Sequence, residues 1–253
     1  MAARRNNVLA EIRFLYLLIY SVYFACLNFI PYRLSILIQY DGPLFTSLGI
    51  VGLILLVVDL FTRRNLLRIP YAEIILLFFV VFGVSILWNF KYQFMGNVKC
   101  MIWMAVQVLY LGGADPDVAA DRHRRHIRIF TNVFILLWFI GAIWSFGQYL
   151  VQYSAQFDLI LNDLPDTLPM GFSEGRLFGV FIDPNYAAVC SLFAIGFALY
   201  NIRKDTPVWA KIWYAITIAF QGFYVILSGS RTAELALLVV SALAGAFLVP
   251  GRF

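Results

Sequence analysis

Residues 121–151 read DRHRRHIRIFTNVFILLWFIGAIWSFGQYLV, and this stretch decides the fold class. A cluster of arginines and histidines ends at Arg128, and no charged residue follows before Val151. A helix needs about 20 mainly apolar residues to cross the hydrocarbon core of a bilayer. Residues 129–151 therefore predict a transmembrane helix that begins beside a strongly basic segment.

The composition of the whole chain is typical of a membrane protein. Hydrophobic residues make up 62% of the 253 residues, charged residues make up 13%, and the mean hydropathy is +0.82. Because soluble domains carry about 25% charged residues, a soluble core of this length would leave much apolar surface in water. The net charge of +5 does not indicate nucleic-acid binding, because the basic residues lie between apolar runs and form no continuous face.

The same hydropathy argument predicts seven further spans. The expected fold is all-α: a polytopic helical bundle of about eight transmembrane helices that forms one membrane domain over residues 1–253. The first apolar run is too long for a cleaved signal peptide and is predicted to be an uncleaved span. The amphipathic segment 32–41 is predicted to lie along the outer interface. The eight predicted spans are 14–30, 44–60, 70–89, 98–113, 129–151, 179–200, 212–228 and 232–249.

The distribution of lysine and arginine predicts the orientation of these spans. With both termini in the cytoplasm, 14 of the 19 basic residues lie on the inner side and 5 lie on the outer side. Such a bias toward the cytoplasmic loops is the usual determinant of membrane topology. This orientation makes residues 152–178 an acidic outer loop. The outer basic residues are Arg33, Lys91, Lys99, Arg176 and Arg231.

The segment 175–188, GRLFGVFIDPNYAA, is the first candidate for chemistry. Proline favours the first turn of a helix and aspartate is a good N-cap, so Asp183, Pro184 and Asn185 predict a helix start. The helix predicted from Pro184 to Tyr200 is about 25 Å long at 1.5 Å per residue, slightly less than the bilayer core. The stretch 177–182 is therefore expected to dip into the membrane or lie on it, with Arg176 near the outer surface.

The segment 228–234, SGSRTAE, is the second candidate. It connects the last two predicted spans by a tight turn in which Ser230 can cap the following helix. Glu234 falls in the first turn of that helix, where a negative charge is favoured. Arg231 and free backbone N–H groups at one helix start suit an anionic oxygen, above all that of a phosphate. We therefore expect Ser228 and its neighbours to contribute to a phosphate site.

Each of these features also has a purely structural interpretation. Arg176 and Arg231 are the kind of interfacial residues that extend toward lipid headgroups. The segment 183–185 is also typical of a helix start that is capped for stability alone. Glu234 is positioned to form an ion pair with Arg231 at i, i+3. Both arginines, however, are expected on the same membrane face beside helix starts that favour negative charge. This coincidence favours a shared anion site.

The histidines and cysteines do not predict a metal or redox site. His123 and His126 lie among arginines, whose charge disfavours a divalent metal, and they belong to the basic inner connection. Cys26, Cys100 and Cys190 lie in apolar runs without metal-ligand or redox spacing, which is typical of packing residues. No metal ligand set and no cofactor are predicted.

The segment 176–188 resembles the R-x-x-G-x-x-x-[ND]-P-N-x-x-A signature of the O-antigen ligase and polymerase superfamily. The segment 228–235 resembles that family's second signature, T/S-x-S-R-[GT]-A, which opens the next span but one. The order of the two signatures, the helix between them and the shared outer face all agree with the family. The resemblance covers mainly residues 176–240, because the first five spans agree only in hydropathy.

This resemblance implies a bacterial multi-pass protein of the cytoplasmic membrane. Its relatives transfer a glycan from undecaprenyl pyrophosphate to an acceptor hydroxyl on the outer face, without nucleotide sugar or metal. Ligases use the lipid A core as acceptor, and polymerases use another lipid-linked repeat unit of O-antigen, capsule or exopolysaccharide. Arg176 and Arg231 are then expected to be catalytic by binding the pyrophosphate and stabilising it as it leaves. A polysaccharide chain-length regulator is a candidate protein partner. Asp183, Asn185, Ser228, Ser230 and Glu234 are the expected substrate-binding residues.

The chain departs from the family pattern after the second signature. Family members usually continue into a large outer loop, where ligases carry a catalytic histidine, and this sequence ends at Phe253. We therefore expect the N-terminal part of a longer enzyme, and a polymerase rather than a ligase; a short relative that uses other residues is the alternative. A transporter or flippase component and a non-catalytic scaffold remain the competing functions. The outer acids that qualify as candidate general bases are Asp158, Asp163, Asp166 and Glu174.

Overall fold

Helices make up most of the computed structural model, which describes residues 2–62, 72–92, 94–108, 120–161, 164–202 and 206–248. The chain divides into two compact units, residues 1–23 with 37–127 and residues 24–36 with 128–253. α1 (Ala2–Leu27) and α6 (Ala120–Leu150) each contribute to both units. The units are therefore described separately.

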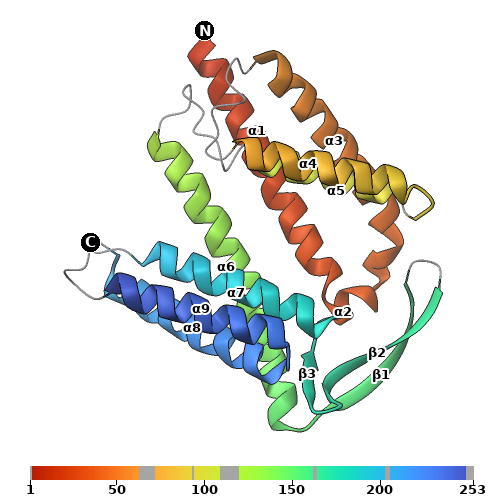
Figure 1. Cartoon of the computed structure of the whole chain (residues 1–253), viewed down its shortest axis with the longest axis vertical. Helices are drawn as coiled ribbons and strands as arrows, with labels where there is room; N and C mark the ends of the chain where they lie inside the picture. Colours follow the sequence, from red (N-terminus) through yellow and green to blue (C-terminus); the bar gives the residue numbers. More distant parts are fainter. Residues whose placement is uncertain are drawn as a thin grey trace. The chain divides into compact units, whose positions relative to one another are not determined.

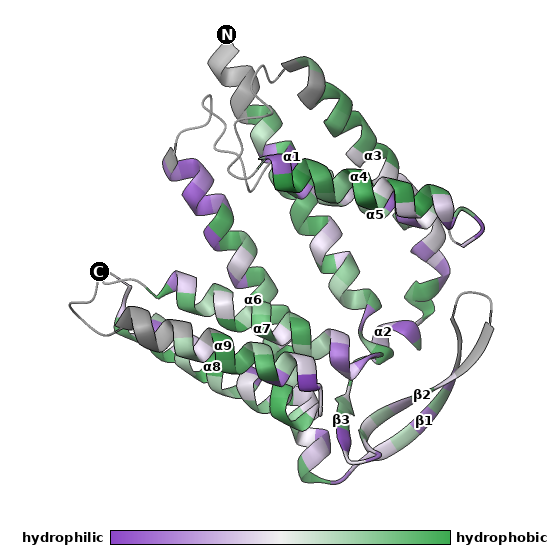
Figure 2. Ribbon diagram, viewed as in Figure 1, coloured by the Kyte–Doolittle hydropathy of each residue, from purple (hydrophilic) through white to green (hydrophobic). Residues whose placement is uncertain are grey.

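The first unit contains α3 (Asp41–Thr62), α4 (Ala72–Trp88) and α5 (Phe94–Gln107), with the first parts of α1 and α6. Aromatic side chains join α1 to α5, where the rings of Tyr20 and Trp103 stack with centroids 4.8 Å apart. The side chains of α4 are nearly all apolar, as its mainly green colour in Figure 2 shows, and most of them are exposed. Exposed apolar side chains of this density are typical of a lipid-facing helix.

The second unit contains α2 (Ile30–Arg33), the rest of α6 and the helices of the C-terminal part. α7 (Pro184–Asn201), α8 (Val208–Leu227) and α9 (Arg231–Leu248) lie side by side (Figure 1). The core forms where α6, α7 and α8 meet the segment around Phe181, whose ring makes edge contacts with the rings of Trp138 and Tyr224.

A three-stranded antiparallel sheet occupies the region that we expected to be a loop. Its strands are β1 (Ser154–Leu161), β2 (Leu164–Ser173) and β3 (Arg176–Gly179), in the order β1-β2-β3. The prediction of an all-α protein is therefore wrong here. Leu168, Met170 and Leu177 are buried, so one face of the sheet has an apolar cover that offsets the cost of ordering these strands.

Among the described residues, four helices are long and apolar enough to cross a membrane, and α4 is a shorter apolar helix. The first part of α6 is hydrophilic and the remainder is apolar, as Figure 2 shows. The predicted span 179–200 begins later than expected, because its helix starts at Pro184 after β3 and a turn. The predicted interfacial segment 32–41 includes a 3-10 helix (Ile36–Tyr40). These four candidate spans are Val8–Leu27, Ile36–Val58, Asp121–Leu150 and Val208–Leu227.

Candidate functional site

Arg176, the first residue of β3, joins the two motif segments that the sequence singled out. Its Nε donates a hydrogen bond to the backbone carbonyl of Ser228 at 2.8 Å, across 52 positions of sequence. Its Nη2 donates to the Oδ1 of Asn185, also at 2.8 Å. The start of α7 and the turn between α8 and α9 therefore meet at one guanidinium group.

The start of α7 confirms the predicted helix cap. Asp183 is the N-cap residue in extended backbone conformation, and Pro184 occupies the first helical position. The Oδ1 of Asp183 accepts the backbone N–H of Asn185 at 2.8 Å. This bond satisfies one of the N–H groups that a helix start leaves without a partner. It also fixes the backbone of Asn185, whose side chain holds Arg176.

The turn between α8 and α9 packs closely against the side chain of Arg176. Gly229 has a φ of +62°, and a Cβ at this position would lie 3.3 Å from both Cγ and Nε of Arg176. The Ser228 hydroxyl donates to the carbonyl of Val225 at 2.7 Å and accepts the backbone N–H of Ser230 at 3.3 Å. The side chain of Ser228 is fully buried. Ser228 therefore contributes its backbone carbonyl to the site.

Arg231 is the first residue of α9 and its side chain is exposed. Glu234 is half-buried in the first turn, and its backbone N–H donates to the carbonyl of Ser230 at 2.9 Å. The predicted ion pair between Arg231 and Glu234 is wrong, because no ion pair within 4 Å joins these two described residues. Helical side chains lean toward the N-terminus, so Arg231 extends beyond the start of the helix.

The site presents several hydrogen-bond donors at one end of the helices α7 to α9. A guanidinium has five N–H donors, and the described contacts of Arg176 use two of them. Arg231 and the first turn of α9 add further positive charge and backbone N–H groups. Planar, paired donors of this kind suit a phosphate or carboxylate oxygen.

The segment that carries Arg176 is fixed by two helices. The Tyr224 hydroxyl of α8 donates to the carbonyl of Phe178 at 3.1 Å. The Ser145 hydroxyl of α6 accepts the backbone N–H of Val180 at 3.1 Å. Gly179 between them has a φ of +66°, and a Cβ there would overlap the Ser145 side chain. Sequence reasoning missed Ser145 and Tyr224, although both are polar residues within apolar spans.

The candidate bases lie in different environments. Glu174 is exposed in the turn directly before β3, two residues from Arg176. Asp158 is exposed on β1, and its Oδ1 accepts a hydrogen bond from the Thr167 hydroxyl of β2 at 2.9 Å. Asp163 and the side chain of Asp166 lie outside the described part of the chain. Among the candidate bases whose side chains are described, Glu174 is therefore the nearest to Arg176 in the sequence.

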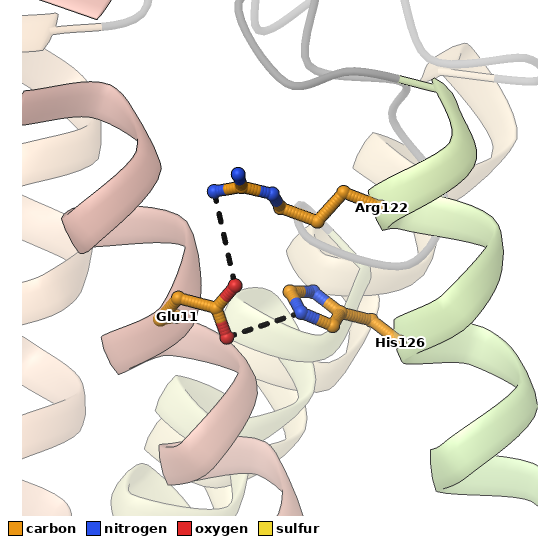
Figure 3. A network of polar contacts seen from close by, with 3 residues as sticks. All are labelled: Glu11, Arg122 and His126. Carbon is orange, nitrogen blue, oxygen red and sulfur yellow. Dashed lines mark ion pairs between the residues drawn. The ribbon is translucent and has the colours of Figure 1, made fainter. Parts of the chain in front are cut away.

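The basic segment at the start of α6 forms a structural network in the first unit. The Nε2 of His126 lies 3.1 Å from the Oε2 of Glu11, and the Nη1 of Arg122 lies 3.8 Å from the Oε1 of Glu11 (Figure 3). The His126 ring is buried and stacks on Phe14 with centroids 4.2 Å apart. His126 therefore joins the first part of α6 to α1. His123 lies one turn earlier on α6.

The remaining candidate ligands do not assemble. Cys26 and Cys100 are half-buried, and Cys190 is buried in the core of the second unit. All three are free thiols. Within the described residues, no group of histidine, cysteine and acidic side chains is arranged to hold a metal ion.

Comparison with protein-family models, with curated proteins and with solved structures finds no match to this chain. The site that joins Arg176 to Asn185 and Ser228 is therefore interpreted from its own geometry.

Proposed function

We propose that this protein transfers a glycan from undecaprenyl pyrophosphate to an acceptor hydroxyl during cell-surface polysaccharide assembly in bacteria. The observation that carries the proposal is the pair of hydrogen bonds by which Arg176 joins Asn185 to the carbonyl of Ser228. These bonds bring together the two segments that resemble the signatures of O-antigen ligases and polymerases. The proposal includes eight spans, both termini in the cytoplasm and a site on the outer face.

The proposed reaction requires stabilisation of a leaving pyrophosphate. The acceptor oxygen forms a bond to the anomeric carbon of the donor sugar, and the bond from that carbon to the phosphate oxygen breaks. The electron pair stays on the pyrophosphate, which gains negative charge. Arg176 and Arg231 stabilise this charge, because fixed donors interact more strongly with the transition state than with the substrate. In this proposal the carboxylate of Glu174 acts as the general base and accepts the proton of the acceptor hydroxyl.

The other site residues position the arginines or line the anion site in this proposal. Asp183 caps α7 and thereby fixes Asn185, which holds Arg176. Ser228 acts through its carbonyl, whereas Ser230 and Glu234 belong to the start of α9 beside Arg231. The chemistry draws on charge and hydrogen bonding alone and assigns no step to a metal or cofactor. The expected partners are the lipid-linked donor, the acceptor glycan and a chain-length regulator.

A transporter or flippase component for an anionic or lipid-linked substrate would use the same anion site. Such proteins typically place their binding site near the middle of the membrane, between discontinuous helices. α7 and α8 each run as one helix, and the arginine site lies at their ends. The geometry therefore supports the transferase better.

The proposal is tested by reconstituting the full-length protein in proteoliposomes with an undecaprenyl-pyrophosphate-linked oligosaccharide. Release of undecaprenyl pyrophosphate and growth of the glycan are measured together. We expect Arg231→Gln to lower the rate about 10²- to 10³-fold, the usual loss for one transition-state donor. Arg231→Lys should retain part of the activity, because it keeps the charge but loses the planar donors.

Arg124→Gln is the matched control, since Arg124 is an exposed arginine that pairs only locally with Asp121. It should leave the rate unchanged. A wild-type rate in Arg231→Gln would contradict the proposal. Movement of the intact lipid-linked oligosaccharide across the bilayer, without pyrophosphate release, would instead establish the flippase alternative.

A further inference from the structure

The buried face of α8 carries a polar residue at nearly every turn. Tyr214, Thr217, Gln221, Tyr224 and Ser228 follow one another at spacings of three or four residues, so they share one face of the helix. All five are buried. An apolar span has no need of such a stripe, because lipid and apolar side chains would stabilise it equally well. Polar residues inside a membrane helix are therefore candidates for function.

The two ends of this stripe have protein partners. The Tyr214 hydroxyl donates to the Oδ1 of Asn132 on α6 at 2.9 Å. The Tyr224 hydroxyl donates to the carbonyl of Phe178, and the carbonyl of Ser228 accepts from Arg176. The stripe thus ends at the segment that carries the anion site.

The middle of the stripe has no protein partner. Thr217 and Gln221 are both 0% exposed. Within the described part of the chain, the Thr217 Oγ1 and both polar atoms of the Gln221 side chain make no hydrogen bond. A buried polar group without a partner is unfavourable, because it loses the hydrogen bonds that it made to water in the unfolded chain. Three such atoms on adjacent turns therefore require a ligand that the protein itself does not supply.

Small side chains of α7 face this part of α8. Tyr224 packs in one cluster with Ala187, Cys190 and Ala194 of α7. Tyr214 packs in another cluster with Ala198 of α7. Since Thr217 and Gln221 lie between these tyrosines on the same helix face, they lie opposite the stretch from Ala194 to Ala198.

The chemistry of the side chains limits the ligand to a small neutral molecule. An amide both donates and accepts hydrogen bonds, and a hydroxyl does the same. The sequence of α7 contains no charged residue, and that of α8 contains only Lys211 near its first turn. An ion would therefore lack a compensating charge. Water meets these requirements, because buried water typically makes about three hydrogen bonds to otherwise unsatisfied groups.

We propose that Thr217 and Gln221 bind water between α7 and α8, and we name this place the α7–α8 water site. The bound water completes a row of hydrogen-bonded polar groups along α8. This row extends from Asn132 and Tyr214 to Tyr224, whose hydroxyl donates to the Phe178 carbonyl. The interior of the second unit is therefore hydrated along α8, although its helices are apolar outside. The proposal does not depend on whether the anion site acts on a glycan.

X-ray radiolytic footprinting of the full-length protein in nanodiscs tests this proposal, because radiolysis of bound water oxidises the side chains beside it. Tyr214 and Tyr224 lie on either side of the water site, whereas the equally buried ring of Phe181 provides the reference within the protein. After correction for intrinsic reactivity, we expect the two tyrosines to be oxidised several-fold faster than Phe181. In the double variant Thr217→Val with Gln221→Met, the excess oxidation should disappear.

Ser145→Ala is the matched control, because Ser145 is equally buried but its hydroxyl has protein partners. It should leave the oxidation of Tyr214 unchanged. The single variants Thr217→Val and Gln221→Met should each remove part of the excess, which guards against misfolding of the double variant. Tyrosine oxidation no faster than that of Phe181, or unchanged in all three variants, would overturn the proposal.

Discussion

Substitution of Gly179 by alanine tests how tightly the segment that carries Arg176 is held. Gly179 has a φ of +66°, and an alanine in the left-handed region costs about 1–2 kcal/mol. The new methyl group would also overlap the Oγ and Cβ of Ser145 on α6. Overpacking of this kind costs about 1–3 kcal/mol. Together the two effects predict that Gly179→Ala lowers the free energy of unfolding by about 2–5 kcal/mol.

Gly175→Ala separates the two contributions. Gly175 has a similar φ of +73°, but no atom lies within 4 Å of the position that its Cβ would take. This variant should therefore lose only the conformational part, about 1–2 kcal/mol. Thermal unfolding in detergent, followed by size-exclusion chromatography of the remaining folded protein, compares the two variants. We expect Gly179→Ala to unfold several degrees below Gly175→Ala.

The contact with Ser145 is tested by a double-mutant cycle. Ser145→Gly removes the two side-chain atoms that the alanine methyl would overlap. In this background Gly179→Ala should cost only as much as Gly175→Ala, which gives a coupling of about 1–3 kcal/mol. If Gly179→Ala is no less stable than Gly175→Ala, the packing of β3 against α6 is not as described, and the argument for a fixed Arg176 fails.

Substitutions at three further sites test the caps and networks, each by thermal unfolding. Asp183→Ala should cost about 0.5–2 kcal/mol by removing the cap of α7, whereas Asp183→Asn should be nearly neutral. Tyr224→Phe should cost about 0.5–1.5 kcal/mol, because it removes one hydrogen bond from the Phe178 carbonyl, which keeps its bond from the backbone N–H of Phe181; an unchanged midpoint would refute the contribution of the Tyr224 hydroxyl. Glu11→Gln should cost less than about 1 kcal/mol, because Glu11 is half-exposed and solvent screens its contact with His126.

The features predicted correctly from the sequence are those with local causes. The helix that starts at Pro184 was located to the residue, because Asp183 and Pro184 determine the start by capping and by a fixed φ. The apolar character of the helices likewise follows from short runs of sequence. Four of the eight spans predicted from hydropathy coincide with described helices that are long and apolar enough to cross a membrane.

The features that the sequence did not reveal depend on contacts between distant segments. The sheet over residues 154–179 was expected to be a loop, because its acidic residues and prolines hide the alternation that identifies strands. Its stability comes from an apolar cover supplied by other elements. Ser145 and Tyr224 were missed because a hydroxyl in a span does not indicate which distant backbone group it will bind.

The anion site that we propose for Arg176 and Arg231 is tested most directly by binding of undecaprenyl pyrophosphate to the full-length protein in nanodiscs. Loss of one charge-assisted hydrogen bond costs about 1.5–3 kcal/mol, so Arg176→Gln and Arg231→Gln should each weaken binding roughly 10- to 100-fold. The control variant Arg124→Gln changes an exposed arginine outside the site. It should bind undecaprenyl pyrophosphate as tightly as the wild-type protein does. Wild-type affinity in both site variants would contradict the account.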